Sequence, residues 1–461
     1  MSKAAESFAN IDALPNSWTW ARLGDVCRTT SGGTPSRKNA EYFTGDIPWV
    51  KSGELPDGLV SEVEERITAA AVANSSAKLF PAGTLLIALY GATVGKLGIL
   101  KEAATTNQAV CAIFPPEYLD TKYLFWYLRC VRSDLVAQAV GGAQPNISQG
   151  ILRELRVPIA PLDQQKRIVA EIEKQFSRLD EAVANLKRVK ANLKRYKAAV
   201  LKSAVAGRLV ETEAELARRE GRSYETGEQL LQRILETRRS QWQGKGKYKE
   251  PAAPDTTDLP ALPEGWAWAS VDQLVAHLTD GDHQAPPQTD QGIPFLVIGN
   301  VRGGEIDFSD TRFVGEAYYN SLDPNRQPKL GDLLYTLVGS YGIPVRVTTE
   351  KPFCIQRHMA ILRPHEHSPI SYLTLAMASD NVFRQATTVA TGTAQLTVPL
   401  AGLRQIAIPL PSISEQERIV AEVDRRLSLL RETGTQVRAN LQRAERMRQA
   451  LLGQAFAGRV Q

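Results

Sequence analysis

Residues that could bind a phosphate or a metal are present, but each pattern is incomplete. Gly91 to Lys96 resembles a phosphate-binding loop, yet it is one residue shorter than GxxxxGK, and Leu97 stands where Ser or Thr would be needed. His365 and His367 could form one edge of a metal site, but two side chains do not hold an ion. We therefore expect no catalytic residue, no metal and no cofactor in this chain, and interpret it as a binding protein.

The longest uninterrupted helix signal lies mid-chain, from Asp163 to Ala206. This stretch lacks Gly and Pro, Pro158 and Pro161 precede it, and Gly207 follows it, as is usual at helix ends. Such a helix would be about 66 Å long, which is too long for one globular core, so it must pack on a partner. The partner is predicted at 412–457, where the sequence repeats. The predicted heptad seam consists of Ile172, Leu179, Leu186, Leu193, Val200, Val423, Leu430, Val437 and Leu451.

The repeat extends through the whole chain. Gln165–Glu171 matches Gln416–Glu422, and Leu14–Trp20, with its two tryptophans, matches Leu262–Trp268. Short strand-like runs bounded by turns indicate compact α+β blocks. The predicted fold class is α+β: two similar globular domains, each followed by a long helix, with the helices packed as an antiparallel coiled coil and an internal pseudo-two-fold repeat. The predicted segments are domain 1 (1–157), helix 1 (158–207), a linker with a probable helix (208–261), domain 2 (262–408) and helix 2 (409–461).

Composition narrows the class of protein. The 461 residues are 43% hydrophobic and 23% charged, as in ordinary globular proteins. The net charge of +5 is small, but the positive charge is concentrated: 187–202 contains Lys and Arg and no acid. This run is either a solvated helix face or a contact to backbone phosphates. Four scattered cysteines and the absence of an apolar leader or long apolar stretch predict a cytoplasmic protein without disulfides.

The repeated framework carries loops that are not repeated. Ser31-Gly32-Gly33-Thr34 corresponds to Asp280-Gly281-Asp282-His283, and Tyr90–Thr93 corresponds to Val338–Tyr341. A shared scaffold with different loops is typical of two binding domains that recognise different targets. Neutral drift of surface loops is the alternative.

With these features, the chain resembles the specificity subunit of Type I restriction-modification systems. The resemblance covers nearly the whole chain. It rests on two LPxxWxW starts and, in each copy, on a proline-framed strand followed by a Gln-containing box before the long helix, Pro158 to Gln165 and Pro409 to Glu417. Asp163-Gln164-Gln165 departs from the commoner Glu-Gln. The linker segment Lys247–Pro251 is also similar.

The resemblance implies a role in host defence and a set of partners. Each globular block would be a target recognition domain for one half of a split, asymmetric sequence in double-stranded DNA, and the helices would be the spacer. Two modification subunits carrying S-adenosylmethionine would methylate one adenine in each half. Restriction subunits that use ATP and Mg would join that core.

Within this resemblance, the residues that could contact DNA are those that donate and accept hydrogen bonds on Gly-rich loops. Four of them, Gln144, Asn146, Thr393 and Gln395, could instead cap turns. The predicted DNA-binding residues are Thr34, Ser36, Arg37, Lys38, Lys51, Lys96, Gln144 and Asn146 in the first copy, and His283, Gln284, Asn300, Ser340, Tyr341, Arg357, Thr393 and Gln395 in the second.

Two other functions remain possible on sequence alone. A coiled-coil scaffold that joins proteins without reading DNA would explain the heptads but not the divergent polar loops. A self-contained methyltransferase or nuclease would need motifs that the sequence lacks. Salt-dependent binding to duplex DNA separates the reader from the scaffold.

Overall fold

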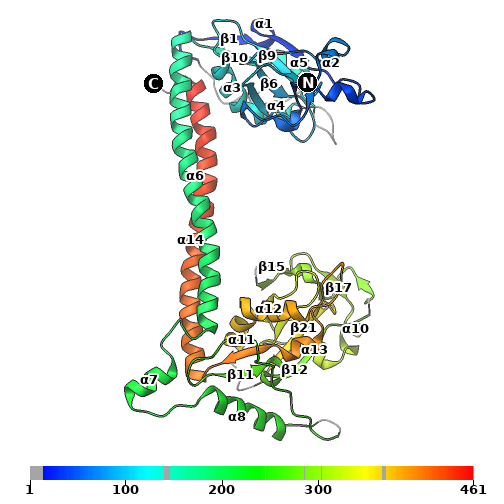
Figure 1. Ribbon diagram of the computed structural model, residues 1–461, viewed down its shortest axis with the longest axis vertical. Helices are drawn as coiled ribbons and strands as arrows, with labels where there is room; N and C mark the ends of the chain where they lie inside the picture. Colours follow the sequence, from blue (N-terminus) through cyan, green and yellow to red (C-terminus); the bar gives the residue numbers. More distant parts are fainter. Residues whose placement is uncertain are drawn as a thin grey trace. The chain divides into compact units, whose positions relative to one another are not determined.

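The computed structural model describes residues 14–139, 146–243, 246–284, 286–302, 304–365 and 370–459. The chain forms two compact units, unit 1 from residues 1–188 and 437–461 and unit 2 from residues 189–436. Each unit contains one globular block of strands and short helices together with part of both long helices (Figure 1).

The block of unit 1 is built on a five-stranded sheet with the strand order β2-β9-β6-β7-β4. Its strand β6 (Leu85–Ala88) is buried on both faces. Leu85 and Ile87 pack into the core that contains α3 (Thr121–Cys130), whereas Leu86 and Ala88 pack into a second core on the other face. The remaining strands of unit 1's two larger sheets are β2 (Arg28–Ser31), β3 (Ile47–Val50), β4 (Gly58–Val60), β5 (Arg66–Ile67), β7 (Leu97–Leu100), β8 (Thr105–Thr106) and β9 (Val110–Phe114).

Helix α3 joins the block of unit 1 to the long helices. Its first turn is capped by the Asp120 carboxylate, which accepts a hydrogen bond from the Tyr123 backbone at 2.9 Å. The rings of Tyr123 and Tyr127 each lie 5.2 Å from Phe456, near the end of the last helix. The shorter helices are α1 (Leu23–Val26), η1 (Ala40–Phe43), η2 (Ser52–Glu54), α2 (Ala69–Ala73), α4 (Arg132–Ala137) and α5 (Gln149–Glu154).

A two-stranded antiparallel ribbon closes each block. In unit 1, β1 (Thr19–Arg22) pairs with β10 (Arg156–Ile159), and Trp20 lies opposite Pro158. In unit 2, β11 (Ala267–Ser270) pairs with β22 (Ala407–Leu410), and Trp268 lies opposite Pro409. The identical register confirms the predicted repeat.

Unit 2 repeats the sheet arrangement with four strands in the order β12-β21-β18-β19. The second parallel pairing also recurs, because β3 pairs with β8 in unit 1 and β14 pairs with β20 in unit 2. The strands are β12 (Val275–Asp280), β13 (Gln288–Thr289), β14 (Ile293–Leu296), β15 (Val301–Arg302), β16 (Glu305–Ile306), β17 (Arg312–Val314), β18 (Leu333–Thr336), β19 (Pro344–Arg346), β20 (Cys354–Ile355) and β21 (Met359–Pro364). The helices of the block are α9 (Val271–Leu274), η3 (Ile298–Asn300), α10 (Glu316–Ser321), η4 (Pro324–Arg326), α11 (Ile370–Met377), α12 (Asp380–Val389) and α13 (Leu400–Gln405).

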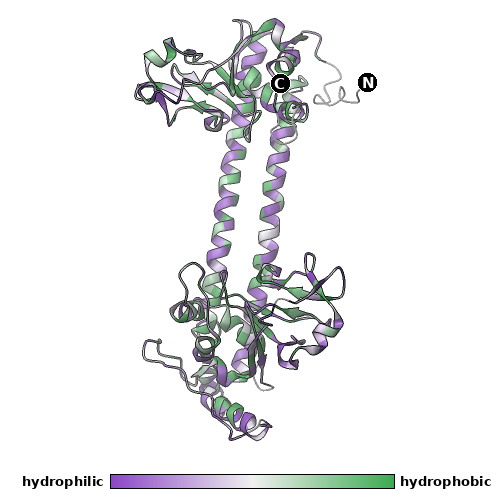
Figure 2. Cartoon of the chain, turned by 90° about the vertical axis from the view of Figure 1, so that its right-hand side faces the viewer, coloured by the Kyte–Doolittle hydropathy of each residue, from purple (hydrophilic) through white to green (hydrophobic). Residues whose placement is uncertain are grey.

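The two long helices are α6 (Leu162–Val205) and α14 (Ile413–Phe456), within a residue of the helix signals at 163–206 and 412–457. In unit 1 the start of α6 and the end of α14 share one core, and in unit 2 the end of α6 shares a core with the start of α14. The helices therefore run antiparallel within each unit, as predicted. Figure 2 shows apolar residues interspersed with hydrophilic ones along both.

Every residue of the predicted seam is at least partly buried. Ile172, Val200, Val423 and Val437 are buried, and Leu179, Leu186, Leu193, Leu430 and Leu451 are half-buried. Gly434 does not break α14. A Cβ at this position would lie 4.0 Å from Leu193, so the glycine faces α6.

Both long helices end in the same way. Gly207 (φ 64°) and Gly458 (φ 70°) adopt the left-handed conformation, and each lies close to a proline, Pro263 and Pro15 respectively. After Gly207 the chain forms α7 (Glu213–Glu220) and α8 (Gly227–Ser240). Helix α8 was predicted, whereas α7 was not.

Candidate nucleic-acid interface

In the first copy, the Gly-rich loop after β2 lies against the turn between β8 and β9. The Gly32 and Gly33 backbone amides donate to Val110 (3.1 Å) and Thr106 (2.9 Å) carbonyls. A Cβ on Gly32 would lie 2.3 Å from the Thr106 carbonyl oxygen, so only glycine allows this close approach. The exposed hydroxyl of Thr34 donates to the Gln108 side chain across the junction.

Two of the predicted basic residues in this region are held by acidic partners. Arg37 lies 2.6 Å from Glu65 and 4.2 Å above the ring of Phe43. Lys51 Nζ lies 2.9 Å from Glu64 and 3.1 Å from Glu65. The hydrogen bond from Arg37 keeps the pKa of the Glu65 carboxyl below its ordinary value, and the bond to Glu64 raises the pKa of Lys51. These cations fix the loop, and much of their charge is neutralised.

The second group of predicted DNA-binding residues in unit 1 lies on the turn between β6 and β7 and on the neighbouring segment at Asn146. Asn146 is exposed and pairs with Tyr90 through a backbone bridge. Gly91 (φ 87°) and Gly95 (φ 79°) make the turn possible, and Lys96 is half-buried at its end. Because this turn joins two antiparallel strands, it lacks the strand-to-helix context of a phosphate loop. The exposed Ser36 and Lys38 lie on the first loop, and Gln144 lies outside the described residues.

The second copy brings together the corresponding segments. Gly281 donates to the Met359 carbonyl at 3.2 Å, and a Cβ on Gly281 would lie 2.2 Å from the Ile355 carbonyl oxygen. Arg357 is exposed, and its backbone amide donates to the Asp282 carbonyl at 3.2 Å. The exposed His283 ring lies 2.7 Å from the Asp280 carboxylate, and Gln284 beside it is exposed.

The other turn of unit 2 presents an exposed polar edge. Gly339 donates to the Leu396 carbonyl at 3.0 Å, and a Cβ at Gly339 would lie 2.9 Å from the Gln395 side chain, so this turn lies beside the segment that carries Gln395. The side chains of Ser340, Thr393 and Gln395 are exposed. Tyr341 is half-buried because its ring stacks on Phe383 at 5.4 Å and its hydroxyl lies 3.0 Å from that of Thr387.

Asn300 needs a correction. It is 6% exposed, and its amide oxygen accepts from the Val297 backbone at 2.9 Å. Its amide nitrogen donates to the carbonyls of Asp307 (3.2 Å) and Asp310 (2.9 Å). These bonds close the turn around β15 and β16 and leave the amide inaccessible to a base edge, so Asn300 is a structural residue.

The structure adds two candidates. Gln108 and Gln356 occupy matching positions in the two copies, at the junction where the Gly-rich loop meets its partner turn. Gln108 is exposed and Gln356 is half-buried. Their repetition in the sequence could have identified them as site residues.

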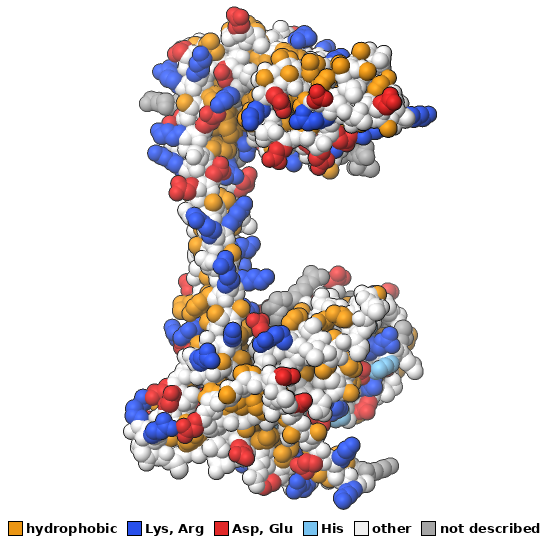
Figure 3. Space-filling view, in the orientation of Figure 1, with side chains coloured by type: hydrophobic (Ala, Val, Ile, Leu, Met, Phe, Trp, Pro, Cys, Tyr) orange, Lys and Arg blue, Asp and Glu red, His pale blue; other side chains and the backbone are white. Residues whose placement is uncertain are grey.

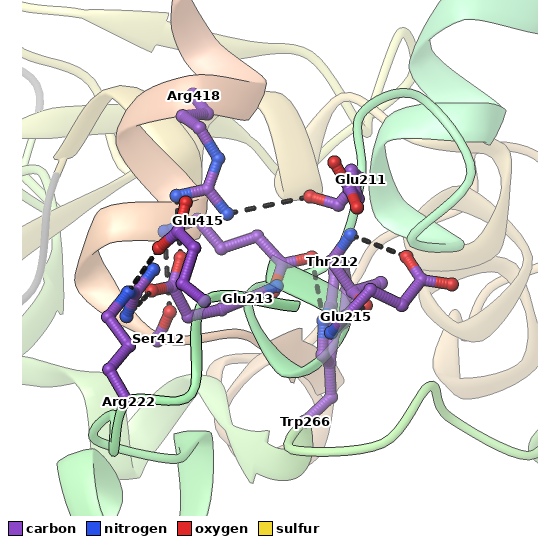
Figure 4. A network of polar contacts seen from close by, with 10 residues as sticks. Glu211, Thr212, Glu213, Glu215, Arg222, Trp266, Ser412, Glu415 and Arg418 are labelled. Atoms are coloured by element: carbon purple, nitrogen blue, oxygen red, sulfur yellow. Dashed lines mark hydrogen bonds and ion pairs between the residues drawn. The ribbon is translucent and has the colours of Figure 1, made fainter. Parts of the chain in front are cut away.

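A buried polar network fixes the start of α14 in unit 2 (Figure 4). Trp266 donates to Glu415 at 3.0 Å, and the other Glu415 oxygen accepts from the Glu213 backbone at 2.9 Å. The Glu213 carboxylate pairs with Arg222 and Arg418, both at 2.6 Å. Burial raises the pKa of Glu415 above its ordinary value.

Unit 1 has the same contact in simpler form. Trp18 donates to the Gln164 side chain at 2.8 Å. The next glutamine bonds back to the preceding turn in both copies, Gln165 to the Ala160 carbonyl at 2.7 Å and Gln416 to the Pro411 carbonyl at 2.9 Å. These residues in the first turn of each long helix therefore fix the position of the helix.

Two further properties concern the described residues. They contain no helix long and apolar enough to cross a membrane. No group of three or more His, Cys, Asp or Glu side chains in this part of the chain could hold a metal ion.

Residues 15–195 match a family model described as the Type I restriction modification DNA specificity domain. The chain is 32% identical over 170 residues to the EcoR124I/EcoR124II specificity subunit of Escherichia coli, which covers 36% of this chain and 42% of that protein. A match to the MjaIX specificity subunit of Methanocaldococcus jannaschii is 30% identical and covers 39% of this chain and 41% of that protein, so the chain spans about two fifths of these relatives. The Escherichia coli EcoBI specificity subunit is 23% identical, covering 97% of this chain and 87% of that protein.

Solved structures share the fold. A chain from a structure described as the basis of complex assembly and conformational transition of the type I R-M system has a TM-score of 0.70 and 19% identity, covering 97% of this chain and all of that one. The HsdS subunit from Thermoanaerobacter tengcongensis has a TM-score of 0.54 and 18% identity, covering 97% of this chain and 98% of that one.

Proposed function

Because residues 15–195 match the Type I restriction modification DNA specificity domain and the chain is similar to specificity subunits over 97% of its length, we propose that it is the non-catalytic subunit that recognises a bipartite, asymmetric DNA target. The block of each unit acts as a target recognition domain for one half-site. The repeated framework with unlike loops carries this proposal. Ser31–Thr34 and Asp280–His283 occupy the same place with different side chains, so two different half-sites can be read.

The candidate contacts follow from exposure in the structure. In the first copy Ser36, Lys38 and Asn146 are exposed, as are Thr34 and Gln108, which hydrogen-bond to each other. In the second copy Gln284, Ser340, Arg357, Thr393 and Gln395 are exposed, as is His283, whose ring contacts Asp280. Arg37, Lys51 and Tyr341 act mainly by holding their loops, because other side chains already engage them.

The chemistry belongs to partners. Two modification subunits with S-adenosylmethionine methylate one adenine in each half-site, and restriction subunits with ATP and Mg²⁺ join that core. The antiparallel helices act as the spacer between half-sites. The complex acts on host DNA in the cytoplasm, and the chain itself needs no cofactor.

The test is genome-wide adenine methylation in a host that expresses this chain with its modification subunit. We expect a split motif with one methylated adenine in each half, on opposite strands. Replacing the first block by that of another specificity subunit should change one half only. A stable complex without methylation and without salt-dependent duplex binding would favour the protein scaffold instead.

A further inference from the structure

One segment of α6 in unit 2 carries positive charge without acidic residues. This basic segment, 190–202, has no Asp or Glu, and every cation in it is exposed. Figure 3 shows Lys and Arg side chains gathered on the long helices. The cations of the basic segment are Lys190, Lys194, Arg195, Lys197 and Lys202.

In the part of the chain that the structure describes, these charges have no acidic partner. Among the described residues, none of the five side chains forms an ion pair. Some other cations on the helices are paired: Arg425 and Arg426 lie 2.8 Å and 2.6 Å from Glu422. Lys174 lies 3.1 Å from Glu171. The basic segment therefore combines five unpaired cations with the absence of any acidic residue in its own sequence.

The basic segment also opposes the packing of the helix that carries it. Lys190 and Lys197 continue the heptad series of Val169, Phe176 and Val183, where an apolar side chain would add to the seam. Lys194 lies four residues after Lys190 and three before Lys197, so like charges neighbour each other on one side of the helix. Polar residues at core-type positions weaken a coiled coil, which indicates a function outside folding.

The segment is attached firmly to the block of unit 2. Val200 and Ala204, at its end, are buried in the core that also contains Leu333 and Tyr335 of β18. From Lys190 to Lys202 the helix rises about 18 Å, comparable with half a turn of duplex DNA. A duplex that lay along this segment would present successive backbone phosphates to its cations.

We propose that the basic segment binds backbone phosphates of the DNA next to the half-site read by the second copy. This inference rests on the proposed function and adds a contact independent of base sequence, since ammonium groups recognise phosphate as point charges. It holds the duplex in register while the loops read bases. An acidic helix of a modification subunit is the competing partner, and the test separates the two.

The experiment uses the complex of the chain with its modification subunits and a cognate duplex. The variant is Lys190→Gln/Lys194→Gln/Lys197→Gln, and the control Lys166→Gln/Lys174→Gln/Arg178→Gln removes the same charge from the part of α6 in unit 1. Affinity is measured across a series of salt concentrations. In a plot of log affinity against log salt concentration, each lost phosphate contact makes the slope less steep by about 0.9. The slope should therefore become less steep by about 2–3 in the basic-segment variant and change little in the control.

Neutral methylphosphonates then locate the contact. Replacing the phosphates beside the second half-site should weaken binding by the wild-type complex but not by the basic-segment variant. An unchanged salt slope in the variant would overturn the inference. Loss of the modification subunits from the variant without DNA, measured by size exclusion, would overturn it in favour of the acidic protein partner. A wild-type complex with no salt-dependent binding would instead contradict the proposed function.

Discussion

The two Gly-rich loops have the same backbone frame but opposite arrangements of charge. In the first copy the loop supplies a cation, Arg37, and the acid Glu65 comes from outside it. In the second copy the loop supplies the acids Asp280 and Asp282, and Arg326 approaches from outside, 3.7 Å and 4.0 Å away. A fixed main chain thus supports loops with different hydrogen-bonding surfaces, which is what reading two unlike half-sites requires.

The largest expected effect on stability comes from the glycines that both Gly-rich loops need for their close approach to a neighbouring carbonyl. In Gly32→Ala or Gly281→Ala, the new Cβ meets a carbonyl oxygen at less than 2.5 Å, so the loop must move. We expect the free energy of unfolding of the affected unit to fall by about 2–3 kcal/mol, with loss of methylation. Chemical denaturation measures the first effect. Gly53→Ala and Gly299→Ala, where a Cβ meets open space, are the controls, and equal stability of all four variants would contradict the close approach.

Next come exposed glutamines, one at a candidate contact surface in each copy. Gln395→Ala should relax base preference in the second half-site only, and Gln108→Ala in the first only. Each change should remove about 1–3 kcal/mol of discrimination at one position, because a glutamine amide can pair bidentately with adenine. Sequencing of methylated sites measures both. A change in both half-sites from one variant would count against independent reading.

A smaller effect on stability is expected at the start of the long helices, where unit 2 has Glu415 and unit 1 has Gln164. Glu415→Gln gives unit 2 the side chain that unit 1 uses at Gln164. The amide can still accept from Trp266, but it leaves the Glu213 backbone without an acceptor, so stability should fall by about 1–2 kcal/mol. The reciprocal Gln164→Glu is the matched variant.

The same residue predicts a dependence on pH. Because burial raises the folded-state pKa of Glu415 above 4.5, its contribution to stability is greatest at low pH and is lost as pH rises through the raised pKa. The stability of wild type relative to Glu415→Gln should therefore decrease over that range in denaturation curves. A constant difference would show that the carboxyl titrates normally.

The smallest effect is expected from the ion pair in the first loop. Arg37 is half-exposed, so Arg37→Gln should cost less than about 1 kcal/mol. Because Arg37 lowers the pKa of Glu65, this stabilisation is present above pH 4.5 and is lost as pH falls through the lowered pKa. In acid-unfolding curves, the variant should therefore lose less stability than the wild type as the pH is lowered.

The sequence predicted the helices and the repeat because both depend on local periodicity and on matched positions. Helix α7 was missed, although Thr212 and Glu215 form a capping box that marks its start. Asn300 was misassigned because an asparagine in a loop can close a turn as readily as it can meet a base. The neutralisation of Arg37 and Lys51 could not be foreseen, since Glu64 and Glu65 come from a distant part of the loop region.

The ribbons that close the two blocks have an evolutionary consequence. The chain enters each block through β1 or β11 and leaves it through the strand paired beside it, β10 or β22. Two recombination events in the gene, one at each strand of a ribbon, would exchange an entire block and leave the helices intact. Inheritance of a new specificity therefore requires no simultaneous change in the rest of the chain.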